Sequence, residues 1–89
     1  MKRVRVLVSG RVQGVFFRAG CAEEAGRRGV GGYVLNRSDG RVEAAFEGDD
    51  PDVDAMVEWC RHGTDSADVR EVEVAEEPPT GETTFDVDR

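Results

Sequence analysis

The alternation of apolar and polar residues predicts strands and helices that follow one another along the chain. Residues 2–9 place a valine at every second position (4, 6 and 8), which is the period of a strand with one buried face. In residues 17–28 the apolar residues Phe17, Cys21 and Ala25 recur at every fourth position. That spacing predicts a helix with one buried stripe.

The middle of the chain predicts two strands joined by a tight turn. Residues 31–37 and 41–47 are rich in strand-forming residues, and the second stretch turns Val42, Ala44 and Phe46 to one face. Between them the Ser-Asp-Gly sequence at 38–40 contains an Asp-Gly pair, which is typical of hairpin turns.

A second helix is marked at both ends. Asp50 is suited to the N-cap, Pro51 to the first helical position, and Gly63 to the C-terminal stop. The apolar residues between them fall at helical spacing and form one stripe: Val53, Met56, Val57 and Cys60.

The last third predicts two more strands. Residues 69–75 alternate, with Val72 and Val74 facing inward, and residues 83–88 alternate as a short terminal strand. The element order β-α-β-β-α-β favours an α+β fold of the ferredoxin-like sandwich type, with an antiparallel sheet and both helices on one face. We expect residues 1–89 to form one domain.

Charge is distributed unevenly. The net charge is −7 and the sequence pI about 4.6, yet residues 1–41 carry +6 and residues 42–89 carry −13. Eleven of the twelve basic residues are arginine, and this acidic, lysine-poor composition resembles proteins of salt-loving organisms. At molar salt the Debye length is only about 3 Å, so the acidic self-repulsion would be screened. The composition therefore predicts a halophilic protein.

Several classes of protein are not favoured by the sequence. It contains no run of 18 apolar residues and no apolar leader, so we expect neither a membrane span nor secretion but a cytoplasmic location. Cys21 and Cys60 are far apart and belong to no Cys/His cluster. We interpret them as core thiols in a reducing cytoplasm, and we expect no metal site.

Residues 10–18, which read Gly-Arg-Val-Gln-Gly-Val-Phe-Phe-Arg, carry the main chemical signal. Two glycines allow a tight turn whose backbone N–H groups approach a ligand, and the positive end of the following helix points to the same place. Arg18 falls in the first turn of that helix, where its side chain leans back over the loop. The segment therefore predicts a site for a tetrahedral oxyanion such as phosphate.

Two further polar residues bear on the chemistry. Asn36 stands near the end of a predicted strand, where it is either a turn residue or a neutral amide that holds a water molecule at a fixed angle. His62, the only histidine, falls at the end of a predicted helix, where it is expected to interact with the helix dipole rather than to act as a base.

Residues 10–18, together with the Gly-Tyr-Val-Leu-Asn-Arg-Ser-Asp-Gly sequence at 32–40, closely resemble the acylphosphatase family. The resemblance implies hydrolysis of acyl phosphates to a carboxylate and inorganic phosphate, without metal or cofactor. It implies that Arg18 is the catalytic arginine and that Asn36 positions the attacking water. The loop that it implies for phosphate binding consists of Arg11, Val12, Gln13, Gly14, Val15 and Phe16.

Three alternatives stay open from the sequence. One is a carbamoyl-phosphate-handling domain of a larger hydrogenase-maturation protein, although the length of 89 residues favours a free-standing enzyme. Another is a module that senses an anion without turnover. A ferredoxin-like RNA binder is disfavoured because the predicted strands carry glutamates at 43, 47, 71 and 73. We expect a monomer that binds a small acyl phosphate and no nucleic acid.

Overall fold

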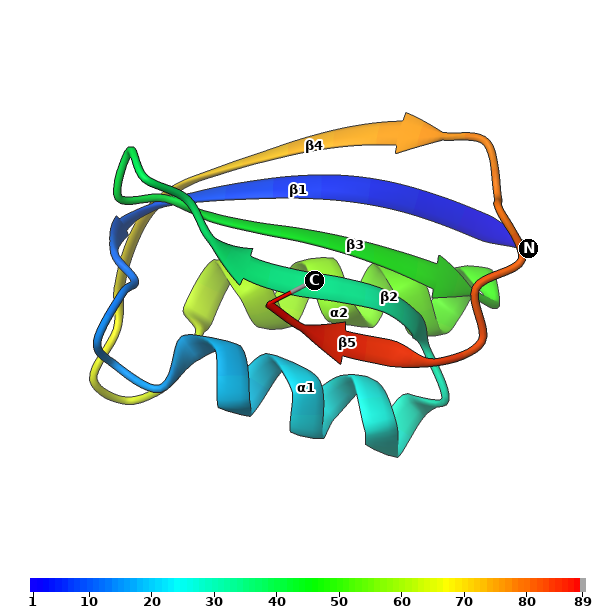
Figure 1. Cartoon of the computed structure of the whole chain (residues 1–89), viewed down its shortest axis with the longest axis horizontal. Coiled ribbons are helices and arrows are strands. Elements are labelled where there is room, and N and C mark those ends of the chain that lie inside the picture. Colours follow the sequence, from blue (N-terminus) through cyan, green and yellow to red (C-terminus); the bar gives the residue numbers. More distant parts are fainter. Residues whose placement is uncertain (89) are drawn as a thin grey trace.

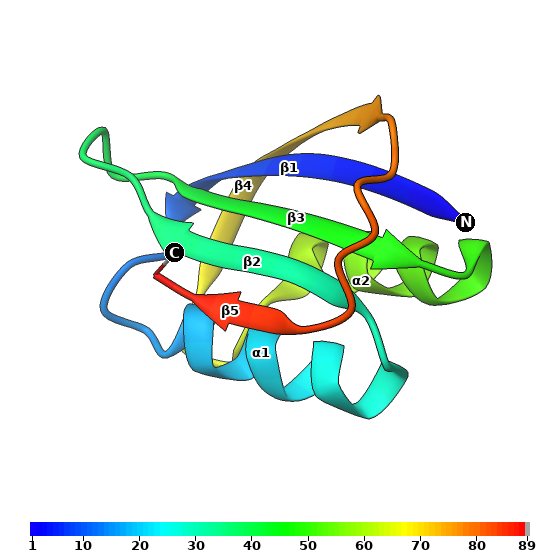
Figure 2. The same ribbon diagram turned by 45° about the vertical axis from the view of Figure 1, so that its right-hand side comes forward.

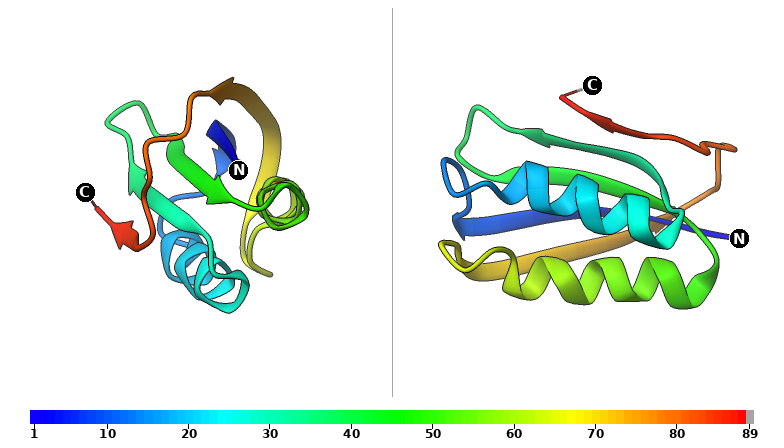
Figure 3. Two further views of the ribbon diagram at one scale, coloured as in Figure 1. Left: turned by 90° about the vertical axis from the view of Figure 1, so that its right-hand side faces the viewer. Right: turned by 90° about the horizontal axis from the view of Figure 1, so that it is seen from below.

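Seven elements follow one another in the computed structural model, which describes residues 1–88 (Figure 1). They are β1 (Lys2–Arg11), α1 (Phe17–Arg28), β2 (Gly31–Asn36), β3 (Val42–Gly48), α2 (Asp50–His62), β4 (Asp68–Glu77) and β5 (Phe85–Val87). The five strands form one sheet, and both helices lie side by side against the same face of it (Figure 3). The predicted α+β, ferredoxin-like sandwich is confirmed.

The strand order is β4-β1-β3-β2-β5. The first four strands in this order pair antiparallel, as predicted. The terminal strand β5 instead pairs in parallel with β2, so the complete sheet is mixed. This pairing follows from the connection, since β4 and β5 lie at opposite edges and the chain must cross one end of the sheet between them.

The core lies between the sheet and the two helices. The predicted inward residues of β1, β3, α1 and α2 are buried, with the exception of Val57, which is only partly buried. The prediction for β4 is wrong at Val74, which is 44% exposed. β4 is an edge strand, and an edge strand is covered less completely by the helices than the central strands are.

Strand β1 is two residues longer than predicted. It continues through Gly10 and Arg11, with a shift in its pairing to β4 after Ser9. Gly10 has φ +123°, and a Cβ at this position would lie 2.2 Å from the carbonyl oxygen of Asp68. Glycine therefore lets the bulged strand stay paired here, and the loop that follows β1 begins only at residue 12.

Residues 78–84, which we call the strap, carry the chain from β4 to β5 across the end of the sheet (Figure 2). Glu47 on β3 holds the strap in place. Its carboxylate accepts hydrogen bonds from the backbone N–H groups of Thr80 at 2.8 Å and Gly81 at 2.7 Å. It also accepts one from the Arg3 guanidinium at 3.1 Å.

Arg3 and Glu47 form a buried charge cluster, because they are only 5% and 2% exposed. Arg3 also binds the carboxylates of Glu77 at 2.8 Å and Glu82 at 3.0 Å, one on β4 and one on the strap. The N–H group of Thr80, and then those of Gly81 and Arg3, hold the pKa of Glu47 below its ordinary value of 4.5. The charged form of Glu47 is thus the form that stabilises the fold.

We expect Glu47→Gln to destabilise the protein at pH 7 by about 1–3 kcal/mol, because the amide cannot accept all of these hydrogen bonds. The folded pKa is lowered, so this stabilisation is fully present above pH 4.5 and is lost as the pH falls through the folded value. Thermal unfolding between about pH 3 and 7 should show a shallower acid slope for the variant than for the wild type. Glu71→Gln, on exposed β4, is the control; parallel slopes for wild type and Glu47→Gln would contradict the assignment.

Candidate active site

The loop of residues 12–16 joins β1 to α1 and is anchored by its two valines. Val12 and Val15 are 1% and 2% exposed, so their side chains belong to the core. Gly14 between them has φ +74°, a left-handed conformation that favours glycine. The anchored valines and the turn at Gly14 fix the path of the backbone between the sheet and the helix.

Three hydrogen bonds, donated by two side chains, hold this loop to its neighbours. The Gln13 amide donates to the carbonyl oxygens of Arg37 at 2.8 Å and Arg41 at 3.0 Å, which lie on either side of the β2–β3 turn. The Thr64 hydroxyl donates to the carbonyl oxygen of Val15 at 2.6 Å. The loop is therefore fixed relative to the end of β2, where Asn36 stands.

The N-terminal end of α1 has no acidic or capping side chain of its own. Phe16 is its N-cap residue, with φ 63°, and no side chain within residues 1–88 donates or accepts a capping hydrogen bond there. The first turn contains no acidic residue but does contain Arg18. The positive helix end and a guanidinium thus point to the same region, an arrangement that favours a bound anion.

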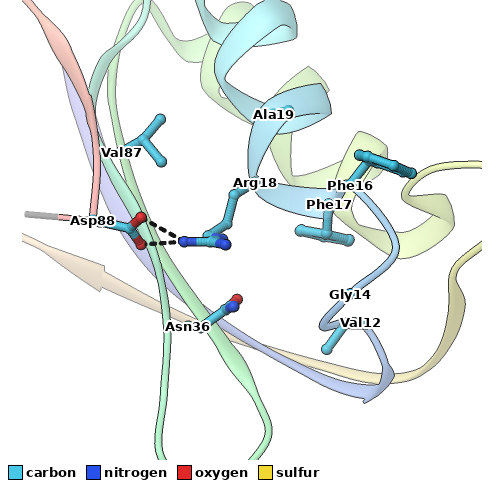
Figure 4. A pocket seen from close by; sticks show the side chains of 9 residues that line it. All are labelled: Val12, Gly14, Phe16, Phe17, Arg18, Ala19, Asn36, Val87 and Asp88. Atoms are coloured by element: carbon cyan, nitrogen blue, oxygen red, sulfur yellow. Dashed lines mark hydrogen bonds and ion pairs between the residues drawn. The ribbon is translucent and has the colours of Figure 1, made fainter.

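Arg18 already faces an oxyanion in the structure. Its Nη1 donates to both carboxylate oxygens of Asp88, at 2.6 and 2.5 Å (Figure 4). Asp88 follows β5 directly, and its backbone N–H donates to the carbonyl oxygen of Val34 on β2. Both partners are substantially exposed, with side chains 37% and 54% accessible, so a ligand anion can compete for the guanidinium.

Asn36 contributes an unsatisfied acceptor. Its Oδ1 atom is buried and has no hydrogen-bond partner within residues 1–88. Buried polar atoms are almost always paired, so such an atom calls for a donor from water or from a ligand. Asn36 and Arg18 line the same hollow of about 460 Å³, with Arg18 between the loop and β5 (Figure 4).

The structure brings together most of the residues that the sequence predicted for the site. Those that line the hollow are Val12, Gly14, Phe16, Arg18 and Asn36. Three predicted loop residues do not line it: Arg11 belongs to β1 opposite Asp68, Gln13 bonds the β2–β3 turn, and Val15 is in the core. The lining is completed by four residues for which the sequence pattern indicates no site role: Phe17, Ala19, Val87 and Asp88.

Other candidate groups lie away from this hollow. His62 is in the last turn of α2, as predicted. Cys21 and Cys60 are free and fully buried, and a hydrogen bond between them, together with burial, raises the pKa of the Cys21 thiol. Within residues 1–88 no three His, Cys, Asp or Glu side chains are grouped closely enough to hold a metal ion. Neither described helix has the length and apolar character that crossing a membrane requires.

Comparison with known proteins agrees with this geometry. The acylphosphatase family model matches residues 4–87, nearly the whole chain. The chain belongs to the acylphosphatase family. Among curated acylphosphatases, that of Rubrobacter xylanophilus is 60% identical over 90% of this chain and 73% of its own length. That of Haloarcula marismortui is 55% identical over 96% of this chain and 93% of its own.

A solved structure supports the same conclusion at the level of the fold. The crystal structure of the Bacillus subtilis acylphosphatase superposes with a TM-score of 0.93 at 38% identity, covering 98% of both chains. The prediction of an acylphosphatase-type hydrolase is therefore confirmed.

Proposed function

We propose that residues 1–89 act as one domain that hydrolyses acyl phosphates, the mixed anhydrides of carboxylic and phosphoric acids, to a carboxylate and inorganic phosphate. The observation that carries this proposal is the contact of Arg18 with two carboxylate oxygens, in the same hollow as the unpartnered Oδ1 of Asn36. The first group is suited to an oxyanion and the second to a water molecule.

Arg18 and the loop provide the anion site. In the proposed complex the phosphoryl group displaces Asp88 and accepts hydrogen bonds from the Arg18 guanidinium and from backbone N–H groups of segment 11–16. These donors are held in place before the substrate arrives, and they stabilise the charge that is spread over the phosphoryl oxygens in the transition state.

Asn36 orients the attacking water through its Oδ1 atom, which contributes to the rate by positioning. Neither Arg18 nor Asn36 can serve as a general base, because arginine stays protonated and asparagine does not titrate. The phosphoryl oxygens of the substrate accept the proton instead. The carboxylate is a good leaving group that needs no acid, so the proposed reaction needs no metal or cofactor.

The direct test is phosphate release from acetyl phosphate, with and without exhaustive chelation. We expect activity that survives the chelator, and little release from a phosphomonoester, whose alkoxide is a much poorer leaving group. Loss of activity on chelation with recovery on adding a divalent ion would refute the metal-free mechanism. Comparable hydrolysis of the phosphomonoester would refute the proposed reaction class.

We also propose that the protein is adapted to a cytoplasm of high salt concentration. We propose further that it is a monomer and that it has no affinity for nucleic acid. The proposal is supported by its net charge of −7 and its arginine-rich, lysine-poor composition. We expect the melting temperature to rise between 0.1 and 2 M KCl, since screening removes repulsion among the carboxylates. Equal melting temperatures at the two salt concentrations would contradict adaptation to high salt.

A further inference from the structure

The connection from α2 to β4, residues 63–67, lies beside the loop of residues 12–16 (Figure 1). It turns sharply at Gly63, whose φ is +68°. A Cβ at this position would lie 2.9 Å from Cε2 of Phe17, so glycine lets the chain pass close to the first turn of α1. This close approach places the hydroxyl group of Thr64 at the loop.

The position of Thr64 is fixed by two hydrogen bonds. Its carbonyl oxygen accepts one from the N–H group of Ala67 at 3.0 Å, which closes the turn between α2 and β4. Its hydroxyl donates one to the carbonyl oxygen of Val15 at 2.6 Å, in a partly buried place. The side chain of Val15 is only 2% exposed and belongs to the core. The bond from Thr64 to Val15 therefore joins two parts of the chain that are themselves held in place.

The bond to the Val15 carbonyl also acts on the following residue. This carbonyl and the N–H group of Phe16 belong to one planar trans peptide, so they point in opposite directions. A donor that fixes the carbonyl thereby fixes the direction of the N–H group. Phe16 lines the hollow and is the N-cap residue of α1, and its N–H group is among the proposed phosphoryl donors of segment 11–16.

The backbone of Phe16 needs such support. Its φ of 63° lies in the left-handed region, where a bulky residue is strained. The peptide after Phe16 is fixed by the helix, because the N–H group of Gly20 donates to the Phe16 carbonyl oxygen at 3.0 Å. The peptide before Phe16 lies outside the helix. Its rotation would return Phe16 to a negative φ and would reverse the direction of the N–H group. The Thr64 hydroxyl opposes this rotation.

We propose that Thr64 is a positioning residue of the anion site: its hydroxyl holds the peptide between Val15 and Phe16 in the orientation that binds the phosphoryl group. The inference rests on the proposed function. Thr64 is not among the residues that line the hollow, so it acts through this peptide rather than on the substrate. Loss of the hydroxyl should therefore weaken the anion site even though Arg18 and Asn36 are unchanged.

The test measures phosphate affinity by titration calorimetry and kcat/KM with acetyl phosphate. Thr64→Val keeps the shape of the side chain but removes the donor, and both quantities should fall about fivefold to tenfold, the scale of one hydrogen bond. Thr64→Ala removes the donor with a smaller side chain and should act in the same direction. Thr64→Ser keeps the hydroxyl and should stay within about twofold of the wild type. Ser66→Ala is the matched control, since it removes an exposed hydroxyl from the same turn.

A second background separates this role from a general effect on folding. Glycine adopts a φ of 63° without strain, so Phe16→Gly removes the tendency of the preceding peptide to rotate. In this background Thr64→Val should lower phosphate affinity by about twofold or less, whereas a loss of packing would lower it equally in both backgrounds. Circular dichroism and the melting temperature show which variants are folded.

Wild-type phosphate affinity in folded Thr64→Val and Thr64→Ala would overturn the assignment, and so would an equal loss in Thr64→Ser. An equal effect of Thr64→Val with and without Phe16→Gly would also overturn it. If the wild type binds phosphate but does not hydrolyse acetyl phosphate above the uncatalysed rate, the proposed function fails, while the phosphate affinities still decide the role of Thr64. If the wild type binds no phosphate, the anion site and the role of Thr64 fail together.

Discussion

Replacing Arg18 by lysine is expected to lower kcat for acyl phosphate hydrolysis by about 10³-fold or more. Lysine keeps the positive charge but loses the planar guanidinium, whose nitrogens can donate to several phosphoryl oxygens at once. Contributions of this size are typical where an arginine stabilises phosphoryl transfer. Steady-state kinetics with acetyl phosphate measures the effect. A folded Arg18→Lys protein with wild-type turnover would remove Arg18 from the mechanism.

Asp88→Asn tests the Arg18–Asp88 ion pair by removing the negative charge of its other member. If Arg18 binds phosphate as proposed, phosphate must displace the Asp88 carboxylate from it, and an exposed ion pair of this kind contributes about 0.2–1 kcal/mol. We therefore expect Asp88→Asn to bind phosphate up to about fivefold more tightly, whereas Arg18→Lys binds it more weakly. The rise in melting temperature with phosphate reports both changes, because the ligand stabilises only the folded state.

Asn36→Ala is expected to lower kcat by about 10²–10³-fold, the scale of losing one preorganised polar group. Phosphate affinity should stay within about threefold, because the proposed anion site consists of Arg18 and the loop and does not include Asn36. A loss that falls on kcat and spares binding is characteristic of a contact made in the transition state. Steady-state kinetics and phosphate titration of the same preparation separate the two quantities.

Two controls make the Asn36 result interpretable. Asn36 ends β2 next to the turn at 38–40, so circular dichroism and the melting temperature must show that the variant folds. Ser38→Ala, on the exposed turn, should keep wild-type kinetics. If folded Asn36→Ala turned over at the wild-type rate, Asn36 would be a turn residue and the water would be positioned by another group.

Local patterns were sufficient to predict most of the fold and the central part of the site. The two-residue and four-residue periods identify the strands and helices, and the glycines of residues 10–18 with Arg18 mark the loop. Contacts between distant parts of the chain could not be predicted in this way. Val87 and Asp88 reach the hollow only because the strap carries β5 across the sheet to β2.

The same distinction applies to single side chains. The backbone N–H of Gln13 is predicted to belong to the phosphate loop, and its side-chain amide bonds the β2–β3 turn, a partner that no spacing in the sequence indicates. Val74 follows the alternation of a buried strand, yet it is exposed because β4 lies at the edge of the sheet. A period shows which residues share a face, and the tertiary arrangement decides how well that face is covered.

The position of Asp88 beside Arg18 determines where a purification tag can be placed. A tag fused after residue 89 would begin two positions from Asp88, which lines the hollow. Carboxylates in such a tag would compete with phosphate for the Arg18 guanidinium. A tag ahead of Met1 would lie at the opposite end of β1 from the loop, about 30 Å away for a ten-residue strand (Figure 1). Kinetic comparisons of these variants should therefore use an N-terminal tag or an untagged chain.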